Sequence, residues 1–293
     1  MAGDGAGLCN GSMTSDSEAA SSPLIETFER FFRVKSAADV EGTMGFFSSG
    51  LVTYTDATLG WGLDGFEALR GLFAQYMPTW PPTARSYQTG VLAGESSALV
   101  RMVDTPELFG GELRILGAVD FVDGKIVRWV DYWDSFFFDT AAYESMRTPE
   151  ESFPRDLKES RVPSQAAAEL VEIATTMQRG LAAGDAAAVA ALLHPDVLFE
   201  DMALRAQLVG RAEATRYLGR VLGGAPYGAG SRLRHVVGGA SGGGFEWTAA
   251  DGLVGITALE LDADGMVTRA TSVYDSRQLA AERRAALVVA AGG

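Results

Sequence analysis

The sequence predicts an α+β protein built from two tandem domains, each with helices packed on a curved, mostly antiparallel sheet. Two observations support this prediction. Stretches of the first half recur in the second half, and in each half helix-type spacing of apolar residues precedes a run of strand-type segments. Helices followed by an antiparallel meander are typical of the α+β class.

The internal repeat is clearest in two pairs of segments. FFSSGLVTYTDATLGWGLDGFEAL (46–69) shares its pattern of apolar residues, Asp and Gly with LLHPDVLFEDMALRAQLVGRAEAT (192–215). ILGAVDFVDGKIVRWVDYWDS (115–135) matches ITALELDADGMVTRATSVYDS (256–276) at a constant offset of 141, which is 256 − 115. This period is far longer than that of a solenoid repeat, so the pattern indicates a duplicated domain.

Each half has the same predicted elements. Asp39 and Asp185 are suitable N-caps for a second short helix in each half. Asp-Gly turns in VDGK and ADGM predict a closing hairpin in each sheet. The first half is expected to have helices over 24–38 and 64–77 and strands over roughly 84–92, 96–105, 112–122 and 125–134, and the second half helices over 165–183 and 210–222 with the matching strands.

The expected domain boundaries follow from composition. A polar segment with three prolines separates the halves and reads as a linker. The N-terminal segment is polar and acidic, and we expect it to be disordered. The predicted organisation is a disordered tail over 1–22, a domain over 23–147 that is expected to be the active one, a linker over 148–164, a structural copy over 165–285 and a C-terminal tail over 286–293.

The overall composition excludes several classes of function. A net charge of −14 and a pI near 4.6 argue against binding to nucleic acid or to an anionic membrane surface. No run approaches the roughly 18 apolar residues of a membrane helix, and no secretory signal is recognisable. With one cysteine, Cys9, we expect no intrachain disulfide and a reducing, cytoplasmic setting, and with only two histidines, His194 and His235, we expect no metal site.

The stretch IVRWVDYWDS (126–135) is the first candidate for a site. In a strand, alternate side chains share a face, so Trp129, Asp131 and Trp133 point the same way. A strand face with a carboxyl group between two indoles is unusual for a solvent-exposed surface and is better suited to the wall of a pocket. Burial there would raise its pKa and make it an effective base or acid.

The repeat provides an internal control for these acids. Asp134 and Asp275 occupy the same position in the two halves, which favours a shared structural role such as ending the strand. Asp131 has Ser272 as its counterpart, so its carboxyl group belongs to the first half alone. This difference favours a catalytic role for Asp131, with an exposed strand residue as the alternative.

The order of elements, together with TYTD (53–56), a strand ending in MVD (102–104) and DGKIVRWVDYWD (123–134), resembles the nuclear-transport-factor-2-like, or SnoaL-like, superfamily. The resemblance covers about 24–139 and 165–279 and implies cone-shaped domains with an apolar interior pocket. The first half is most similar to the limonene-epoxide hydrolases. The tandem arrangement is similar to the two-domain epoxide hydrolase/cyclases of polyether biosynthesis.

The resemblance implies roles for four residues. Tyr54 takes the place of the tyrosine that holds a water, and Asp131 that of the aspartate that activates it. Asp104 is the best match for the acid that protonates the epoxide oxygen. Asp56 stands where the hydrolases have asparagine, near the position of the proton-shuttling aspartate of the ketosteroid-isomerase branch. Capping or core packing is the alternative for Asp56, Asp104 and Tyr54.

One residue of the family pattern is missing. The hydrolases use an arginine to bridge the two acids, but Met102 occupies the expected position two residues before Asp104. Arg101 would point to the other face of the strand unless a bulge intervenes. The substrate-contacting wall is predicted to consist of apolar and aromatic side chains, for which core packing is the alternative: Trp129, Trp133, Trp61, Met102, Phe73, Tyr76 and Trp80.

The preferred hypothesis is a cofactor-independent acid–base enzyme that opens an epoxide on an apolar small molecule, by water or by an internal hydroxyl group. A double-bond isomerase, cyclase or dehydratase using Asp56 is the first alternative, and a non-catalytic binder of a hydrophobic ligand is the second. The second half lacks most of these acids, so we expect it to serve as a partner in an intramolecular pseudo-dimer, with a further homodimer possible.

Overall fold

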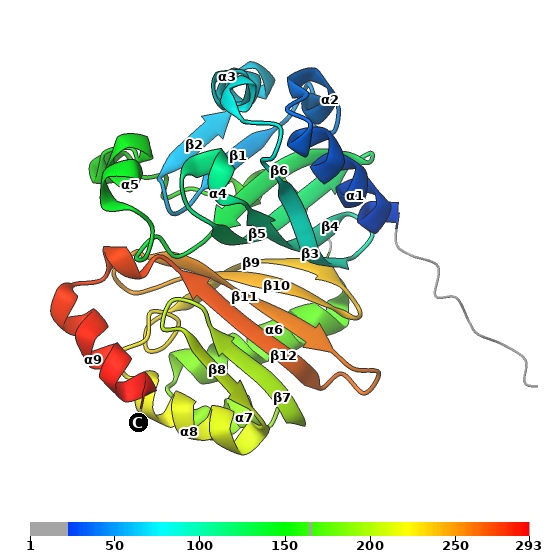
Figure 1. The fold of residues 1–293 in the computed structure, drawn as a ribbon. Coiled ribbons are helices and arrows are strands. Elements are labelled where there is room, and N and C mark those ends of the chain that lie inside the picture. The colour runs from blue at the N-terminus through cyan, green and yellow to red at the C-terminus, as the bar shows by residue number, and fades with distance from the viewer. Residues whose placement is uncertain (1–22, 164–165, 293) are drawn as a thin grey trace, which may run out of the picture.

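Two six-stranded sheets form the centre of the protein (Figure 1). The computed structural model describes residues 23–163 and 166–292, so the predicted tail over 1–22 lies outside the described residues. The strand orders are β2-β1-β6-β5-β4-β3 and β8-β7-β12-β11-β10-β9. Adding six to each strand number of the first sheet gives the second, so the two domains share one topology. The predicted fold class, two tandem cone domains of the α+β class, is confirmed.

The first domain begins with helices and ends with a meander, as predicted. β1 runs parallel to β6, and the other strand pairs are antiparallel, so the sheet is mixed. Its elements are α1 (Pro23–Ser36), α2 (Val40–Met44), β1 (Thr53–Asp56), β2 (Trp61–Asp64), α3 (Phe66–Tyr76), η1 (Met77–Thr79), β3 (Ser86–Ala93), β4 (Ser97–Asp104), α4 (Pro106–Phe109), β5 (Leu113–Val122), β6 (Lys125–Tyr132) and α5 (Thr140–Met146).

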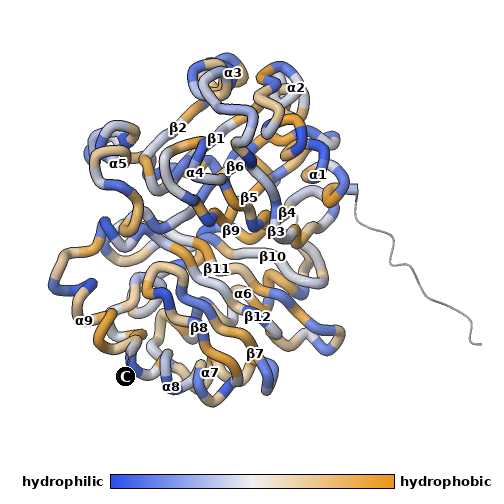
Figure 2. Tube along the Cα trace, in the orientation of Figure 1, coloured by the Kyte–Doolittle hydropathy of each residue, from blue (hydrophilic) through white to orange (hydrophobic). Residues whose placement is uncertain are grey.

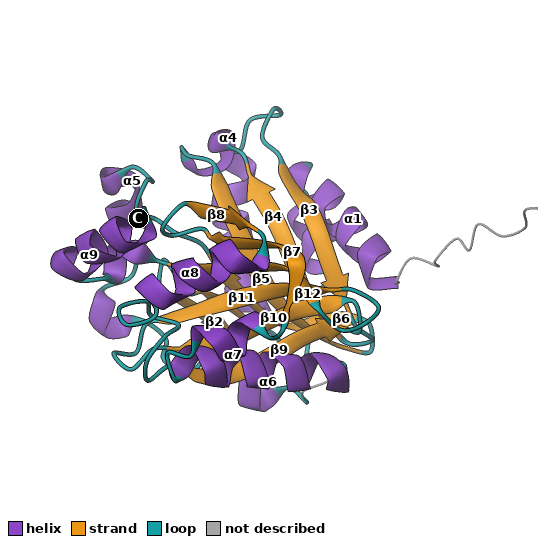
Figure 3. Ribbon diagram, turned by 90° about the horizontal axis from the view of Figure 1, so that it is seen from below, coloured by secondary structure: helices purple, strands orange, loops and turns teal. Residues whose placement is uncertain are grey.

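The second domain repeats this order after two short 3-10 turns, η2 (Glu150–Ser152) and η3 (Glu159–Arg161). Seen from below, α6, α7 and α8 lie across the outer side of its sheet (Figure 3). Its elements are α6 (Ala168–Ala182), α7 (Ala186–Ala190), β7 (Leu193–Asp201), β8 (Ala206–Val209), α8 (Arg211–Val221), β9 (Arg232–Gly239), β10 (Gly242–Thr248), β11 (Val254–Leu261), β12 (Val267–Tyr274), η4 (Ser276–Gln278) and α9 (Ala281–Ala291).

The structure differs from the sequence prediction at three places. The short edge strands β2 and β8 were not predicted. The segment predicted as a linker contains Leu157, which is fully buried between the sheets. The C-terminal tail expected from residue 286 is instead part of α9, because Leu287 packs into the core of the second domain.

Local sequence signals account for the ends of several elements. Asp39 accepts a hydrogen bond from the N–H of Gly42, and Asp185 accepts one from the N–H of Ala188, as N-caps do. Asp123 and Gly124 both have positive φ, which a tight hairpin between β5 and β6 requires. These predicted caps and the hairpin are confirmed.

The two sheets pack face to face, with the main helices on the outer sides (Figure 1). Apolar residues follow the strands between the two helical layers (Figure 2). The buried interface cluster combines residues of both domains, among them Leu99, Val130, Ile256 and Val273. A Cβ atom added to Gly244 would lie 2.3 Å from Leu99, so this glycine allows the sheets to approach closely.

Polar contacts across the interface are reciprocal. Asp134 accepts hydrogen bonds from the backbone N–H and hydroxyl of Ser276, both within 2.9 Å. Asp275 accepts the equivalent bonds from the N–H and hydroxyl of Ser135, at 3.1 and 2.8 Å. The predicted shared structural role of Asp134 and Asp275 is confirmed, because each ties its strand end to the other domain.

A buried charge cluster also joins the domains. The guanidinium of Arg128 donates to Asp120 of its own sheet at 3.0 Å and to Glu246 of the second sheet at 2.7 Å. His235 lies 2.9 Å from Asp120, and the hydroxyl of Tyr132 donates to Glu246. Buried charges need such partners, so separating the two halves would leave Arg128 and Glu246 without each other's compensating charge. No helix within the described ranges is long and apolar enough to cross a membrane.

Candidate active site

The first domain contains a cavity beneath its helices. Every predicted site residue except Trp129 and Met102 lines it. The lining residues are Lys35, Tyr54, Asp56, Leu59, Trp61, Leu72, Phe73, Tyr76, Trp80, Asp104, Phe109, Leu113, Ile115, Asp131, Trp133 and Met146. Its free volume is about 50 Å³. A water needs roughly 10–15 Å³ of such space, so the closed cavity has room for a few waters.

Strand pairing brings two of the acids together. β1 and β6 pair in parallel with Asp56 opposite Asp131, so both carboxyl groups project from the same face of the sheet. On the other side of β6, Gly117 of β5 stands opposite Asp131. A Cβ atom at Gly117 would lie 3.3 Å from Oδ1 of Asp131 and 3.2 Å from Nε1 of Trp129. Glycine at this position therefore avoids steric crowding of the two hydrogen-bonded groups.

Asp131 is buried and held by two donors. Nε1 of Trp129 donates to Oδ1 at 2.6 Å, and the hydroxyl of Tyr54 donates to Oδ2 at 2.8 Å. Burial, with the charge of Asp56, raises the pKa of Asp131 to about 7, although the two hydrogen bonds act in the opposite direction. Burial beside Asp131 raises the pKa of Tyr54 well above its ordinary value, so Tyr54 stays a neutral donor.

Asp56 has a partly structural role. Its Oδ1 accepts the backbone N–H groups of Thr58 and Leu59, at 2.9 and 2.8 Å, and so caps the turn after β1. Nε1 of Trp133 donates to Oδ2 at 3.1 Å. Burial raises the pKa of Asp56 to about 6 against these hydrogen bonds. The carboxylate is therefore well solvated by protein donors, which lowers its value as a base.

Asp104 pairs with a cation that the sequence prediction missed. Nζ of Lys35 lies 3.4 Å from both carboxylate oxygens of Asp104, and the hydroxyl of Ser86 also donates to this carboxylate. Lys35 lies in the last turn of α1 and reaches the cavity from above the sheet. The sequence signal for this residue is that Lys35 lies on the same face of the helix as Phe28, Phe31 and Phe32, where a charged side chain is unexpected.

Arg101 points away from the cavity, as strand parity predicts. It forms an ion pair with Glu260 of the second domain, with 2.6 Å between nitrogen and oxygen. The bridging arginine of the hydrolase pattern is therefore absent from the described part of the cavity wall. Lys35 is the cation that faces Asp104 instead.

Aromatic side chains close the cavity on one side. Trp61 stacks on Tyr76 with ring centroids 5.7 Å apart, Tyr76 meets Phe109 edge-on at 6.1 Å, and Trp80 meets Phe109 edge-on at 6.0 Å. Trp129 does not line the cavity, because its ring packs among the phenylalanines of α1. The buried side chain of Met102 also belongs to the core beside the cavity.

The second domain supports one wall of this cavity. The guanidinium of Arg277 donates to the carbonyl groups of Ser135, Phe136 and Phe138, at 2.6, 3.3 and 2.9 Å. Phe138 packs edge-on against Trp133, which lines the cavity, with ring centroids 5.6 Å apart. Arg277 of the second domain therefore holds the Ser135–Phe138 loop, which supports the cavity wall of the first domain at Trp133.

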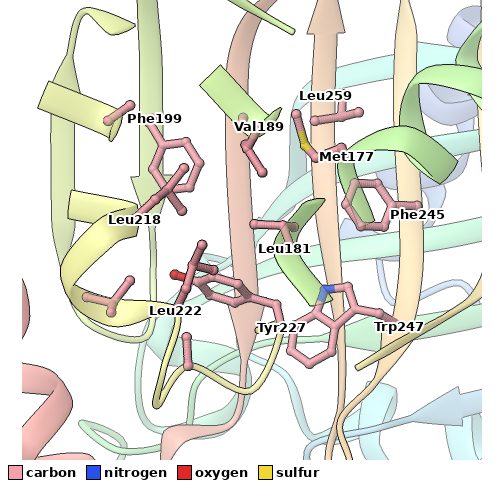
Figure 4. Close-up of a cluster of buried hydrophobic side chains, with 14 of the residues drawn as sticks. Met177, Leu181, Val189, Phe199, Leu218, Leu222, Tyr227, Phe245, Trp247 and Leu259 are labelled. Atoms are coloured by element: carbon pink, nitrogen blue, oxygen red, sulfur yellow. The ribbon is translucent and has the colours of Figure 1, made fainter. Parts of the chain in front are cut away.

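The interior of the second domain is filled by side chains. Asp201, the counterpart of Asp56, accepts hydrogen bonds from the hydroxyls of Tyr217 and Tyr227, at 3.0 and 2.9 Å, and from the N–H of Leu204. Burial raises its pKa to about 6. Figure 4 shows Tyr227 and Trp247 among the surrounding apolar side chains, and both are fully buried.

Within the described residues, no group of three or more His, Cys, Asp or Glu side chains is arranged to hold a metal ion. The family model described as a SnoaL-like domain matches residues 174–278, in the second half. A comparison with curated proteins found no match.

Solved structures with similar folds match one domain each. A protein with a cystatin-like fold from Silicibacter pomeroyi is 23% identical and has a TM-score of 0.36, covering 43% of this chain and 86% of its own. An NTF2-like protein from Burkholderia xenovorans is 18% identical, with a TM-score of 0.32 and coverage of 40% and 91%. A SnoaL-like protein from Burkholderia thailandensis is 14% identical, with a TM-score of 0.34 and coverage of 37% and 97%. Their functions are uncharacterised or unknown.

Proposed function

We propose that the first domain is a general acid–base enzyme that opens an epoxide on a small, mainly apolar molecule, with Asp131 as the base. The proposal uses only side chains of this chain. Its main support is the environment of Asp131, a buried carboxyl group with a pKa of about 7 in an aromatic-walled cavity. A base with a pKa near the working pH combines a useful ionised fraction with real proton affinity.

In the proposed hydrolysis, Asp131 accepts a proton from a water held at the Tyr54 hydroxyl. The water oxygen forms a bond to an epoxide carbon as the carbon–oxygen bond of the ring breaks. The alkoxide that results takes a proton from the ammonium group of Lys35, which Asp104 holds in the same cavity. The proton on Asp131 then returns to Lys35 through solvent, so the product is a diol and the enzyme is restored.

This assignment changes the role first given to Asp104. Its carboxylate oxygens already accept hydrogen bonds from both Lys35 and Ser86. We therefore assign proton donation to Lys35 and orientation of Lys35 to Asp104. An internal hydroxyl of the substrate can replace water as the nucleophile, and the reaction is then a cyclisation with the same proton transfers.

A proton-shuttling isomerase is the second candidate. The observation that favours it is the same pKa of about 7, because one carboxyl group can then take a proton from carbon and return it. In this candidate Asp131 is again the base. Asp56 is a weaker choice than first expected, because three N–H groups already bind its oxygens.

The test uses cyclohexene oxide and styrene oxide as probes in water enriched in ¹⁸O. We expect diol formation with label from the solvent, and we expect Asp131→Asn to lower kcat by about 10²–10⁴-fold, the usual share of a general base. Tyr54→Phe should cause a smaller loss, because the carboxyl group keeps its bond from Trp129.

Ser272→Ala, at the matching position of the second domain, is the control and should retain full activity. Turnover that survives Asp131→Asn would exclude Asp131 as the base. An unlabelled isomerised product that depends on Asp131 would favour the isomerase. Tight binding of these probes without turnover in any variant would favour a binding protein.

A further inference from the structure

Trp80 lies between a narrow cavity and a wider groove. Its side chain lines the cavity that contains Asp131, and it also lines a surface groove between the end of α1, the segment after η1 and the start of β3. The groove has a free volume of about 900 Å³, whereas the cavity has about 50 Å³. Pockets for small molecules usually measure roughly 300–1,000 Å³, so the cavity must open to admit a substrate.

Trp80 differs from the other indoles that line the cavity. Nε1 of Trp61 donates to the carbonyl of Met146 at 2.7 Å, and Nε1 of Trp133 donates to Asp56. Nε1 of Trp80 is buried and has no hydrogen-bond partner among the residues that the structure describes. A buried donor without a partner is unfavourable, so a rotation that exposes this N–H to water in the groove would be favoured by the hydrogen bond that it gains.

A second route to the cavity is blocked by fixed side chains. A cleft of about 890 Å³ between the domains shares Leu113 and Trp133 with the cavity. Both residues are buried, and Trp133 is bound through its indole to Asp56 and through its backbone N–H to Thr58. Trp80, in contrast, is partly exposed and precedes two prolines on a surface segment.

We propose that Trp80 is the gate between the groove and the cavity, and that the groove binds the part of the substrate that remains outside. The inference rests on the proposed function for the reaction at Asp131, and it adds the shape of the substrate. The substrate is an elongated molecule with an apolar reactive end and a polar remainder. The polar remainder matches Arg33 and Arg85 at the groove and the unpartnered, buried Oε1 of Gln88.

The test measures binding of phenol and 6-(4-hydroxyphenyl)hexanoate, whose carboxylate supplies the polar outer part, to the full chain by calorimetry and stopped-flow fluorescence. Trp80→Ala should raise the association rate constants of both probes by about tenfold or more, because it removes the gate. Ala37→Trp, which fills the groove from an exposed position, should weaken binding of the hexanoate by about tenfold and change binding of phenol by less than about twofold. Gln207→Trp adds the same bulk to the cleft between the domains and should change neither probe.

Slower binding in Gln207→Trp, or unchanged association rates in Trp80→Ala, would overturn the gate. If Ala37→Trp changed the affinity for both phenols equally, the groove would not be the site that binds the part of the substrate outside the cavity. Failure of both probes to bind wild type and Trp80→Ala would overturn both. None of these measurements involves turnover, so they can fail while Asp131→Asn still abolishes activity, and the reverse.

Discussion

The interiors of the two domains share one aspartate and differ in what surrounds it. Asp56 and Asp201 end equivalent strands, are buried, cap the turn that follows, and have a pKa raised by burial to about 6. Tyr217 and Tyr227 donate to Asp201 in a filled core. Asp56 has Asp131 beside it and faces a cavity. Asp56 and Asp201 therefore share a structural role as caps of the turn. Only Asp56 also has a second carboxyl group and a cavity beside it, which acid–base chemistry would require.

The same contrast extends to the other site residues. Strand pairing sets Tyr54 beside Trp129 in the first domain and Phe199 beside Ala270 in the second. Ser272 pairs with Asp201 at the position where Asp131 pairs with Asp56.

Helix positions agree at an offset of 146, which is 185 − 39 from the two N-caps, so Lys35 corresponds to the buried Leu181. The second domain therefore lacks counterparts of Tyr54, Asp131 and Lys35, although it keeps the turn that Asp201 caps.

The largest expected effect comes from giving the first domain the residue of the second. Asp131→Ser removes the proposed base and should reduce kcat by about 10²–10⁴-fold in the epoxide assay. The protein should stay folded, because serine is smaller than aspartate and Ser272 occupies the equivalent position of the second sheet. Circular dichroism and kcat are the two measurements. Retained activity with an intact fold would refute the catalytic assignment.

Acidification should have the next largest effect. A base with a pKa of about 7 must be ionised, and its ionised fraction falls from about one half at pH 7 to about one hundredth at pH 5, so kcat/KM should fall by about 50-fold over this interval. Asp201→Asn removes the buried acid of the other domain and should leave this profile unchanged. A profile that shifts in Asp201→Asn would show that the two interiors are coupled.

The contribution of Asp131 to the free energy of unfolding should decrease as the pH rises, whereas its contribution to kcat/KM should increase. The pKa of Asp131 is raised in the folded state from about 3.9 in the unfolded chain, so the folded state binds more protons between these values. The contribution of Asp131 to stability is therefore complete below about pH 4 and is lost as the pH rises through about 7. Asp131→Asn should flatten this part of the stability profile, as measured by urea unfolding.

A smaller effect is expected where one domain supports the other. Arg277→Met removes the donors that hold the Ser135–Phe138 loop, and we expect a loss of about 2 kcal/mol in the free energy of unfolding. It should also lower kcat more than it raises KM, because Phe138 supports the cavity wall at Trp133. Arg284→Met is the control, since Arg284 lies 3.6 Å over the ring of Phe136. An equal loss in both variants would argue against a special role for Arg277.

The sequence predicted the fold well and the site in part. The caps and the Asp-Gly hairpin are local signals, and the repeat indicates the same order of elements in both halves, so the fold class and the order of most elements followed from them. The position of Asp131 beside bulky side chains followed from strand parity. Lys35 was missed because helix spacing places it on the core face without showing that it reaches Asp104. The support from Arg277 depends on contacts between domains, and no local pattern encodes them.

The smallest expected effect concerns two tyrosines of the filled interior. Tyr227→Phe removes one of the two hydroxyl donors to Oδ2 of Asp201, so we expect a loss of about 1 kcal/mol in the free energy of unfolding. Tyr274→Phe is the matched control, because the buried hydroxyl of Tyr274 has no partner among the described residues and its removal should be neutral or stabilising. Urea unfolding measures both. A greater loss in Tyr274→Phe than in Tyr227→Phe would mean that burial of Asp201 does not depend on these hydroxyl donors, and the turn that it caps would then have to be held by the backbone N–H groups of Leu204 and Ala203.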